Sequence, residues 1–452
     1  MNTRYGVGWR LVWYALNVIT SEGASVMSTN RLPVVAGNGL LDRRVFLRKG
    51  LAFATIVGAS SYLQEGVAQE QAARGLEPWM TQPGIGFSPY GQPAKHESHV
   101  ARVFGFNFKD FENNGAAWTP LEHMQGTLTP NGLHFVRSHQ GTPDIDPTKH
   151  FLYIHGEVQK PWKFSVADLL KMPMESRQIF LECGGNSNAS WADDPVQKTV
   201  GTIHGLISTA EWTGVPLAYL LKQLGVKPAA QWVVATGADA GAFDMSIPLA
   251  KMMDDCLVAL YQNGERLRPE NGYPVRLIVP GWKAVLSIKW LSSLELSKEP
   301  AMSRNETARY TELLPSGQSR QFSSVMEVKS VITSPSHGMR LSGPGVYEIT
   351  GLAWSGAGKI KRVEVSADGG KSWAPASLLS ANLPMCANRF RIAWKWDGKP
   401  CVLKSRAIDE KGTVQPMRDD LIAKRGKKGF YHYNAVVSWE VDSVGYVSHT
   451  YE

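Results

Sequence analysis

A single cysteine stands at the end of a strand-like segment, in the sequence IFLECGGNSNASW at residues 179–191. Three hypotheses compete for Cys183. A buried structural thiol is the common fate of a free cysteine. A nucleophile would need a base such as His204 or His155, but no family signature of cysteine catalysis accompanies it. A soft metal ligand is the third, and because one thiolate cannot hold a metal well, a cofactor would have to supply the other ligands.

The surroundings of Cys183 favour the metal hypothesis. Gly184 and Gly185 permit positive φ and let the backbone approach a bulky group. Groups suited to an extended anionic ligand occur elsewhere in the chain: Arg137, Ser138, His139, Asn271, Arg276, Lys283, Ser287 and Lys289. Arginine can grip a phosphate with two parallel hydrogen bonds, and lysine adds point charge.

Composition narrows the class of protein. The 452 residues are 43% hydrophobic and 19% charged, which indicates a globular chain of two or three domains. Four cysteines, none in a C-x-x-C or C-x-x-C-H pattern, argue against a disulfide scaffold, a zinc ribbon and a covalently attached c-type haem. The net charge of +8 comes without a dense Lys/Arg cluster, so nucleic-acid binding is not expected.

The N-terminal region carries an export signal. Arg43 and Arg44 precede a mildly apolar run at 51–63 and small residues before Ala68. This pattern predicts a twin-arginine signal peptide within residues 1–68, and hence a folded, cofactor-loaded protein in the periplasm. The run is too short for a membrane span, which needs about 20 apolar residues. Met27 is a plausible alternative start.

Periodicity predicts an α+β protein. We expect an extended arm at 69–100, a mixed α/β domain at 101–300, a connecting segment at 301–325 and a β-sandwich of immunoglobulin type at 326–452. In the first domain the expected helices are 165–172, 216–225 and 248–261, and the expected strands are 151–158, 177–183, 231–237, 274–281 and 288–296. In the second, Asp368-Gly369-Gly370 and Asp397-Gly398 indicate hairpins between strands.

Long motifs give the chain a family resemblance. They include FVRSH, ESRQIFLECGGNS, YPVRLIVPGW, IKWL, KRVEVSADGGKSW and GFYHYNA, spread over roughly residues 95 to 445. The chain resembles the sulfite oxidase family of molybdenum enzymes, and within it the molybdenum subunits of bacterial sulfane dehydrogenases of the Sox sulfur-oxidation system. The resemblance implies a molybdopterin-binding domain followed by an immunoglobulin-like dimerisation domain.

The resemblance also assigns roles to residues. It implies one molybdopterin per subunit, with Cys183 as the thiolate on molybdenum and Tyr310 and Arg137 beside it in catalysis. The remaining cofactor-binding positions that it implies are Ser138, His139, Asp239, Asn271, Arg276, Ser287 and Lys289.

Two departures from the family pattern concern the substrate. Ser187 and Asn188 stand where sulfite oxidases carry arginines, which favours a sulfane sulfur on a carrier protein over free sulfite. Lys283-Ala284-Val285 replaces an acidic residue followed by Gly-Asn. The alternatives are a sulfite dehydrogenase, a reductase of the same fold and a non-catalytic interaction module.

The resemblance further implies partners. A c-type cytochrome subunit would accept the electrons, in a homodimer or a heterotetramer with the cytochrome. The other cysteines have structural interpretations: Cys256 is expected inside a helix in the core, and Cys386 and Cys401 are expected not to pair.

Overall fold

The computed structural model describes residues 34–41, 86, 88–105, 113–379, 381–427 and 429–452. Of the predicted signal peptide, only residues 34–41 are described; Met27, Arg43, Arg44, the cleavage point at Ala68 and all of 69–85 lie outside the described residues. Among the described helices, none is long and apolar enough to cross a membrane.

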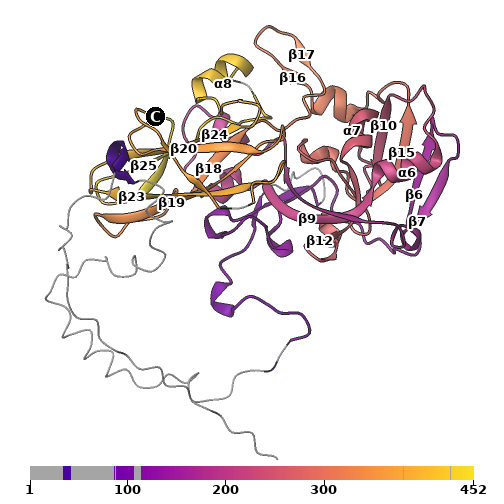
Figure 1. The fold of residues 1–452 in the computed structure, drawn as a ribbon, viewed down its shortest axis with the longest axis horizontal. Helices are drawn as coiled ribbons and strands as arrows, with labels where there is room; N and C mark the ends of the chain where they lie inside the picture. Colours follow the sequence, from indigo (N-terminus) through magenta and orange to yellow (C-terminus); the bar gives the residue numbers. More distant parts are fainter. Residues whose placement is uncertain (1–33, 42–85, 87, 106–112, 380, 428) are drawn as a thin grey trace, which may run out of the picture.

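The described chain forms two β-rich halves that lie side by side (Figure 1). The half on the right of the view contains three sheets. The first has the order β11 (Asp244–Pro248), β10 (Trp232–Gly237), β15 (Leu291–Ser297), β6 (Phe151–Gly156) and β7 (Trp162–Ser165). The second has the order β13 (Glu265–Arg266), β12 (Leu257–Gln262), β9 (Ile207–Pro216) and β8 (Glu175–Glu182), with β14 (Arg276–Ile278) paired to β12. The third joins β3 (Val103–Gly105), β4 (Gly115–Trp118) and β5 (Val136–Ser138).

Short helices connect these strands. The α-helices are α4 (Val166–Leu169), α5 (Val200–His204), α6 (Leu217–Leu224) and α7 (Leu249–Asp254). Single turns are η3 (Lys95–Glu97), η4 (Leu121–His123), η5 (Asn131–Leu133), η6 (Asn188–Trp191), η7 (Pro269–Asn271), η8 (Ala284–Leu286) and the π-turn η9 (Asn305–Arg309). Helix α6 buries one leucine face and ends at Gly225, whose φ of 72° suits a residue without a side chain.

One predicted helix is wrong in its second half. The helix expected over 248–261 ends at Asp254, and Leu257–Gln262 forms β12 instead. Cys256 therefore lies between helix and strand, although it is buried as expected. A short apolar run fits a buried strand as well as a buried helix, so periodicity cannot separate the two.

The half on the left of Figure 1 is a sandwich of two sheets. One has the order β2 (Leu40–Leu41), β23 (Asn388–Trp396), β19 (Gly345–Trp354) and β18 (Lys329–Ser334), with β22 (Ser377–Leu378) also on β23. The other has the order β21 (Ala374–Pro375), β20 (Ile360–Ser366), β24 (Cys401–Asp409), β25 (Ser438–Val441) and β26 (Val447–Thr450). Helix α8 (Arg418–Arg425) and the hairpin β16 (Glu312–Leu313)–β17 (Ser319–Arg320) lie outside the sandwich.

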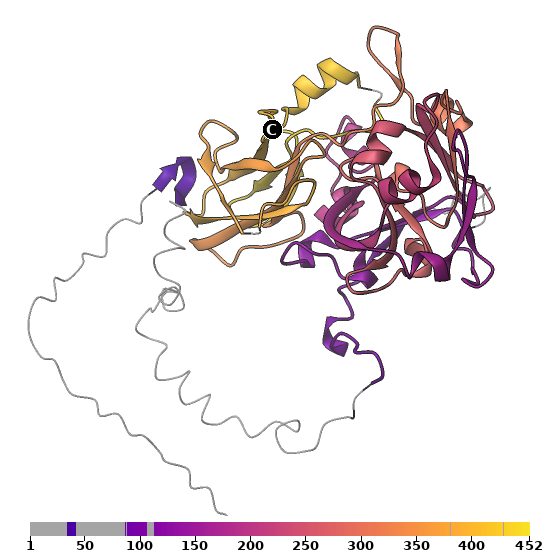
Figure 2. The same ribbon diagram turned by 45° about the vertical axis from the view of Figure 1, so that its right-hand side comes forward.

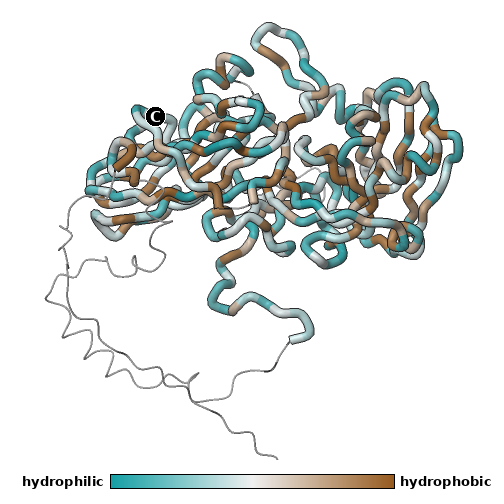
Figure 3. The backbone as a smooth tube through the Cα atoms, viewed as in Figure 1, coloured by the Kyte–Doolittle hydropathy of each residue, from teal (hydrophilic) through white to brown (hydrophobic). Residues whose placement is uncertain are grey.

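Tryptophans fill the space between these sheets. Trp354, Trp394 and Trp439 have no exposed surface. Figure 3 shows hydrophobic segments concentrated in the strands and hydrophilic ones in the outer loops, including the β16–β17 hairpin. The four cysteines are free thiols.

The two expected hairpins have different outcomes. The turn at Asp368-Gly369-Gly370 joins β20 to β21, which pair antiparallel, so this hairpin is confirmed. The hairpin at Asp397-Gly398 is wrong, because β23 and β24 belong to opposite sheets. A Gly at positive φ marks a turn but does not say whether the strands that it joins are hydrogen-bonded partners.

An N-terminal segment belongs to the sandwich, which the sequence pattern did not predict. β1 (Val34–Ala36), η1 (Gly37–Gly39) and β2 form a small unit at the edge of β23. The indigo ribbon lies against the sandwich in both views (Figures 1 and 2).

Candidate active site

Strand β8 sets the position of the Cys183 thiol. It pairs with β9 along its whole length, down to Glu182 opposite Ile207. One residue later the Cys183 amide donates to the Leu206 carbonyl at 2.9 Å, and the Cys183 carbonyl accepts from the Asn186 amide at 2.9 Å. The thiol is thus held at the end of a rigid strand, at the start of a tight turn.

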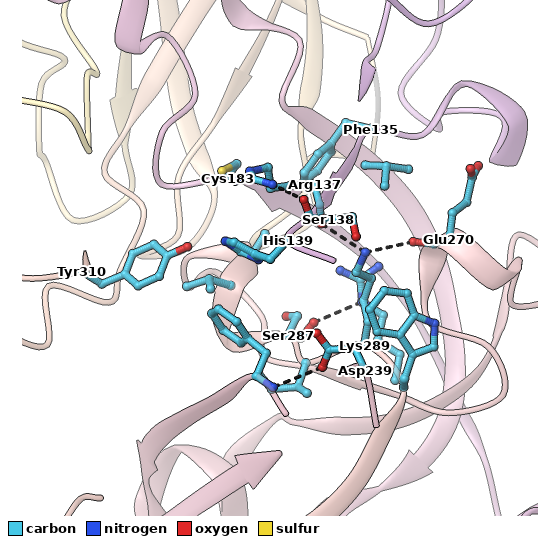
Figure 4. A pocket seen from close by; sticks show the side chains of 17 residues that line it. Phe135, Arg137, Ser138, His139, Cys183, Asp239, Glu270, Ser287, Lys289 and Tyr310 are labelled. Atoms are coloured by element: carbon cyan, nitrogen blue, oxygen red, sulfur yellow. Dashed lines mark hydrogen bonds between the residues drawn. The ribbon is translucent and has the colours of Figure 1, made fainter. Parts of the chain in front are cut away.

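Cys183 lines a pocket that is open to solvent. Every predicted site residue except Asn271 lines it, namely Arg137, Ser138, His139, Cys183, Asp239, Arg276, Ser287, Lys289 and Tyr310. In Figure 4, Cys183 and Tyr310 lie toward one end and Asp239, Ser287 and Lys289 toward the other.

Strand β5 supplies one wall. Arg137 donates to Asn114 Oδ1 at 2.8 Å and to the Gly115 carbonyl at 3.2 Å, which fixes its guanidinium without a carboxylate. His139 stacks on Phe243 with ring centroids 5.0 Å apart. Burial, followed by nearby Arg137, lowers the pKa of His139 to about 3, so its imidazole is neutral at pH 7.

The opposite end of the cavity is cationic. Arg276 is only 5% exposed, and it donates to the carbonyls of Ser287 at 3.2 Å and Asn271 at 3.0 Å. Lys289 Nζ donates to the carbonyls of Arg137 and Glu270 at 3.1 and 3.2 Å. Burial lowers the pKa of Arg276 to about 9 and that of Lys289 to about 7.

These basic groups fit an anionic cofactor. Within the described part of the chain, no carboxylate forms an ion pair with Arg276, and a buried charge without a counter-ion is costly. Asn271 lies behind the cavity at 1% exposure, and its Oδ1 has no hydrogen-bond partner there. A bound phosphate would neutralise Arg276 and Lys289, so the residues present fit a phosphate-bearing pterin.

The metal end offers a single protein ligand. Across the described residues, no group of three or more His, Cys, Asp or Glu side chains could hold a metal ion. Burial raises the pKa of the Cys183 thiol, while the Gly185 amide and Arg137 oppose that shift. A soft metal bound at this sulfur would displace its proton, and the remaining ligands would come from the cofactor.

Tyr310 lies opposite Cys183 and remains a phenol. It follows the π-turn η9, and its hydroxyl points into the cavity (Figure 4). Burial raises the pKa of Tyr310, and Cys183 and Tyr431 raise it further. Tyr431 packs against it with ring centroids 5.1 Å apart, so the C-terminal half contributes to the wall behind the site.

The glycines beside Cys183 do not adopt the positive φ that glycine tolerates better than other residues. Gly184 and Gly185 lie outside the positive-φ region, and Ser187 has a φ of 65° instead. A Cβ on Gly184 would lie 3.0 Å from Lys283 Cδ, and one on Gly185 would lie 3.3 Å from Phe430 Cε1. The chain's own side chains therefore occupy the space that these glycines leave.

Ser187 points away from the cavity. Its hydroxyl binds Lys329 Nζ at 2.5 Å and His204 Nδ1 at 2.6 Å, in a fully buried cluster between the two halves. Asn188 is exposed and does not line the cavity either. The side chains at these two positions therefore leave the cavity without the arginines expected of a sulfite pocket.

Lys283, which the sequence singled out as a possible anion-binding group, lies behind the site, and sequence reasoning did not foresee three further lining residues. Lys283 is 2% exposed, and its Nζ lies 5.6 Å from the Tyr310 ring centroid. Burial lowers its pKa to about 8. Glu270, Phe243 and Trp290 also line the cavity, but their side chains carry no pattern that distinguishes them from ordinary core or surface residues.

Two family models cover most of the same chain. The oxidoreductase molybdopterin binding domain matches residues 139–305. The Mo-co oxidoreductase dimerisation domain matches residues 320–438. The first match contains all predicted site residues except Arg137, Ser138 and Tyr310.

Curated relatives are sulfite oxidases and nitrate reductases. Mouse mitochondrial sulfite oxidase is 32% identical over 321 residues, which is 65% of this chain and 58% of that protein. NADH nitrate reductase of Ulva prolifera is 31% identical over 302 residues, which is 60% of this chain and 34% of that protein. The chain thus spans under two thirds of each relative.

A solved structure matches nearly completely. The sulfane dehydrogenase SoxCD from Paracoccus pantotrophus superimposes with a TM-score of 0.81 at 40% identity. The match covers 83% of this chain and 97% of that one.

Proposed function

Because the chain belongs to the sulfite oxidase family of molybdenum enzymes, we propose that it oxidises sulfur with oxygen taken from water. One observation carries the proposal: a single cysteine and unpaired buried cations converge on one cavity. Molybdenum on one molybdopterin would supply the oxygen-transfer and redox chemistry when bound. Each oxygen moved from water to sulfur releases two protons and two electrons.

The chain's own residues would hold and orient that group. Cys183 offers the metal a soft sulfur, and Arg276 and Lys289 neutralise the phosphate. The Ser287 hydroxyl accepts from the Val279 amide at 3.0 Å, which leaves its proton free to donate to the same anion. The remaining pterin contacts that we propose come from Arg137, Ser138, His139, Asp239 and Asn271.

Tyr310 and Arg137 would act on the reacting atoms. A phenol whose pKa is raised keeps its proton, so Tyr310 donates a hydrogen bond to an oxygen beside the sulfur. Arg137 lies on the same cavity and favours negative charge there. Neutral His139 cannot donate with both nitrogens, which makes it a wall and an acceptor.

A sulfane sulfur on a carrier-protein cysteine is the substrate that we propose. Its support is the 40% identity to a sulfane dehydrogenase and the orientation of Ser187, which brings no cation to the cavity. A small dianion such as sulfite needs cationic donors at the reacting end. A sulfur tethered to a protein is held by its carrier instead.

Location and electron acceptor complete the proposal. We infer export to the periplasm through the twin-arginine signal at Arg43 and Arg44. A c-type cytochrome subunit would take the electrons, since this chain has no C-x-x-C-H sequence for haem attachment. The sandwich matches a dimerisation domain, which supports a homodimer or a heterotetramer with the cytochrome.

Cys183→Ser tests the site. Enzyme activity should fall at least about 100-fold, because the one protein ligand is lost. The molybdenum content of the purified protein, measured by elemental mass spectrometry, should fall by the same factor. The fold should survive, as judged by circular dichroism. Cys256→Ser is the matched control, a buried cysteine away from the cavity. A fully active Cys183→Ser protein would contradict the assignment of Cys183 as the metal ligand, and a wild-type protein without activity or molybdenum would favour a non-catalytic interaction module.

Substrate choice needs a direct comparison. Free sulfite and a persulfide-bearing carrier peptide are assayed with the same enzyme and an artificial electron acceptor. We expect kcat/KM to be at least about tenfold higher for the carrier, a difference of about 1.4 kcal/mol. A higher kcat/KM for free sulfite would favour a sulfite dehydrogenase. The observation that supports this alternative is the presence of three cations, Arg137, Arg276 and Lys289, on the cavity wall.

A further inference from the structure

Residues 34–41 pack against the C-terminal domain, which is distant in sequence, and the last two of these residues are fully buried there. Leu40 and Leu41 have no exposed surface, and Leu40 belongs to the same hydrophobic core as Trp394 and Trp396. Leu40 pairs antiparallel with Trp394 at the edge of β23. Two leucines that lose all contact with water indicate a bound segment, because a passing loop would leave part of their surface exposed.

Polar contacts position this segment. The Gly37 amide donates to Ser372 Oγ at 2.6 Å, and Asn38 Nδ2 donates to the Ala367 carbonyl at 2.7 Å. In return Trp394 Nε1 donates to the Asn38 carbonyl at 2.8 Å. The contacts come from two parts of the sandwich, so the site exists only when that domain is folded.

The sequence Gly-Asn-Gly is matched to the site sterically. A Cβ on Gly37 would lie 2.1 Å from Asp368 Oδ2, and one on Gly39 would lie 2.0 Å from the Lys395 carbonyl oxygen. Gly39 has a φ of 84° and Asn38 one of 54°, a region that glycine and asparagine tolerate best. Apolar contact alone would not require these residue types.

We propose that the edge of β23 beside Trp394 is a docking site for the chain's own leader, residues 34–41. The role of the leader rests on the export proposed above, since Arg43 and Arg44 follow the docked leucines directly. Strand β23, on which the leader docks, ends at Trp396, so the leader can dock only after most of the chain has been made and folded.

Hydrogen–deuterium exchange on the full-length chain tests the docking. Amides of residues 34–41 should exchange at least about tenfold more slowly than those of an unstructured peptide. The double variant Leu40→Asp with Leu41→Asp should lose this protection. The matched control carries Val34→Asp and Val35→Asp, at positions 58% and 41% exposed, and should keep it. An unprotected wild-type segment, or protection that survives the double leucine variant, would overturn the proposal.

Dilution separates docking within one chain from docking between copies. Protection that is independent of protein concentration supports docking within the chain. Protection that disappears on dilution places the segment on a second copy and overturns the proposal as stated. Trypsin cleavage after Arg43 and Arg44 should accordingly be slower in the wild type than in the double leucine variant, and equal rates would contradict docking next to these arginines.

The failure of the export proposal would look different. Arg43→Lys with Arg44→Lys should block export while leaving the exchange protection of residues 34–41 unchanged. Normal export of that variant would overturn the twin-arginine assignment and leave the docking site standing. None of these readouts depends on sulfur oxidation, so a loss of enzyme activity does not bear on them.

Discussion

Lys329 and Arg276 are both buried cations, yet their surroundings are opposite. Lys329, 1% exposed on β18, lies 3.5 Å from a Glu182 carboxylate oxygen, and the other oxygen of that carboxylate accepts from Trp354 Nε1 at 2.7 Å. Among the described residues, the partners of Arg276 are neutral carbonyls and the Trp212 ring, 5.2 Å from its guanidinium carbon. Burial lowers the pKa of both.

The contrast extends to whole regions. Near the boundary of the two halves, Arg425 is paired with Glu312 at 2.6 Å and with Glu327 at 2.8 Å. In the cavity, Lys289 donates to two carbonyl oxygens and lies over the Trp290 ring, and it forms no ion pair with any described carboxylate, although Asp239 and Glu270 are close enough to oppose the lowering of its pKa. The paired cations have a carboxylate counter-ion within the chain, and the Lys329–Glu182 pair joins the two halves. The cations in the cavity have no such counter-ion, so an anionic ligand would stabilise them.

The largest expected effect comes from breaking the paired set. Lys329→Met leaves Glu182 buried without its counter-ion, and we expect the free energy of unfolding to fall by about 3–5 kcal/mol. Urea denaturation followed by tryptophan fluorescence measures it. Since Glu182 precedes Cys183, the variant should also lose bound molybdenum.

A compensating variant sharpens this result. Glu182→Gln combined with Lys329→Met removes both charges, and we expect it to recover about half or more of the lost stability, because no unpaired charge stays buried. If the double variant is as unstable as the single one, the ion pair is not the source of the effect.

Arg276→Met breaks the unpaired set with a smaller effect on folding. Removing a buried charge that has no counter-ion should change the free energy of unfolding of the cofactor-free protein by less than about 1 kcal/mol, or raise it. Pterin and molybdenum content should fall about 10- to 100-fold, measured on purified protein. The control is Arg268→Met, a partly exposed arginine paired with Glu265. A loss of stability without a loss of cofactor would contradict the assignment.

Lys289 gives the smallest and most specific signal, in the pH dependence of stability. Its pKa is lowered from 10.5 to about 7, so between these values the unfolded chain holds more protons than the folded one. The free energy of unfolding of the cofactor-free protein should therefore rise as the pH increases from about 7 to 10.5. Lys289→Met should remove this slope, and exposed Lys222→Met should keep it. Identical pH profiles for wild type and Lys289→Met would contradict the lowered pKa of Lys289.

Some structure was predictable from local pattern. The strand that ends before Cys183 shows as an apolar run with a glycine-rich end, and it forms β8 as expected. The leucine face of α6 was equally clear. β12 was mistaken for helix because a short buried run carries no periodicity that separates the two. The predicted pairing of β23 with β24 was wrong because a turn signal does not specify which strands are hydrogen-bonded partners.

The sequence by itself determined the residue types at the site and their family: the lone thiol, the arginines and lysines, and the motifs around them. Only the tertiary structure decided which residues these side chains contact and how deeply they are buried. Ser187 looked like a pocket residue because it follows Cys183 closely, yet its φ of 65° turns it toward Lys329. Likewise Leu40 and Leu41 looked like part of a leader, and the fold buries them against Trp394. Burial and pairing depend on residues that are distant in sequence, so spacing along the chain cannot reveal which charges are compensated and which remain open to a ligand.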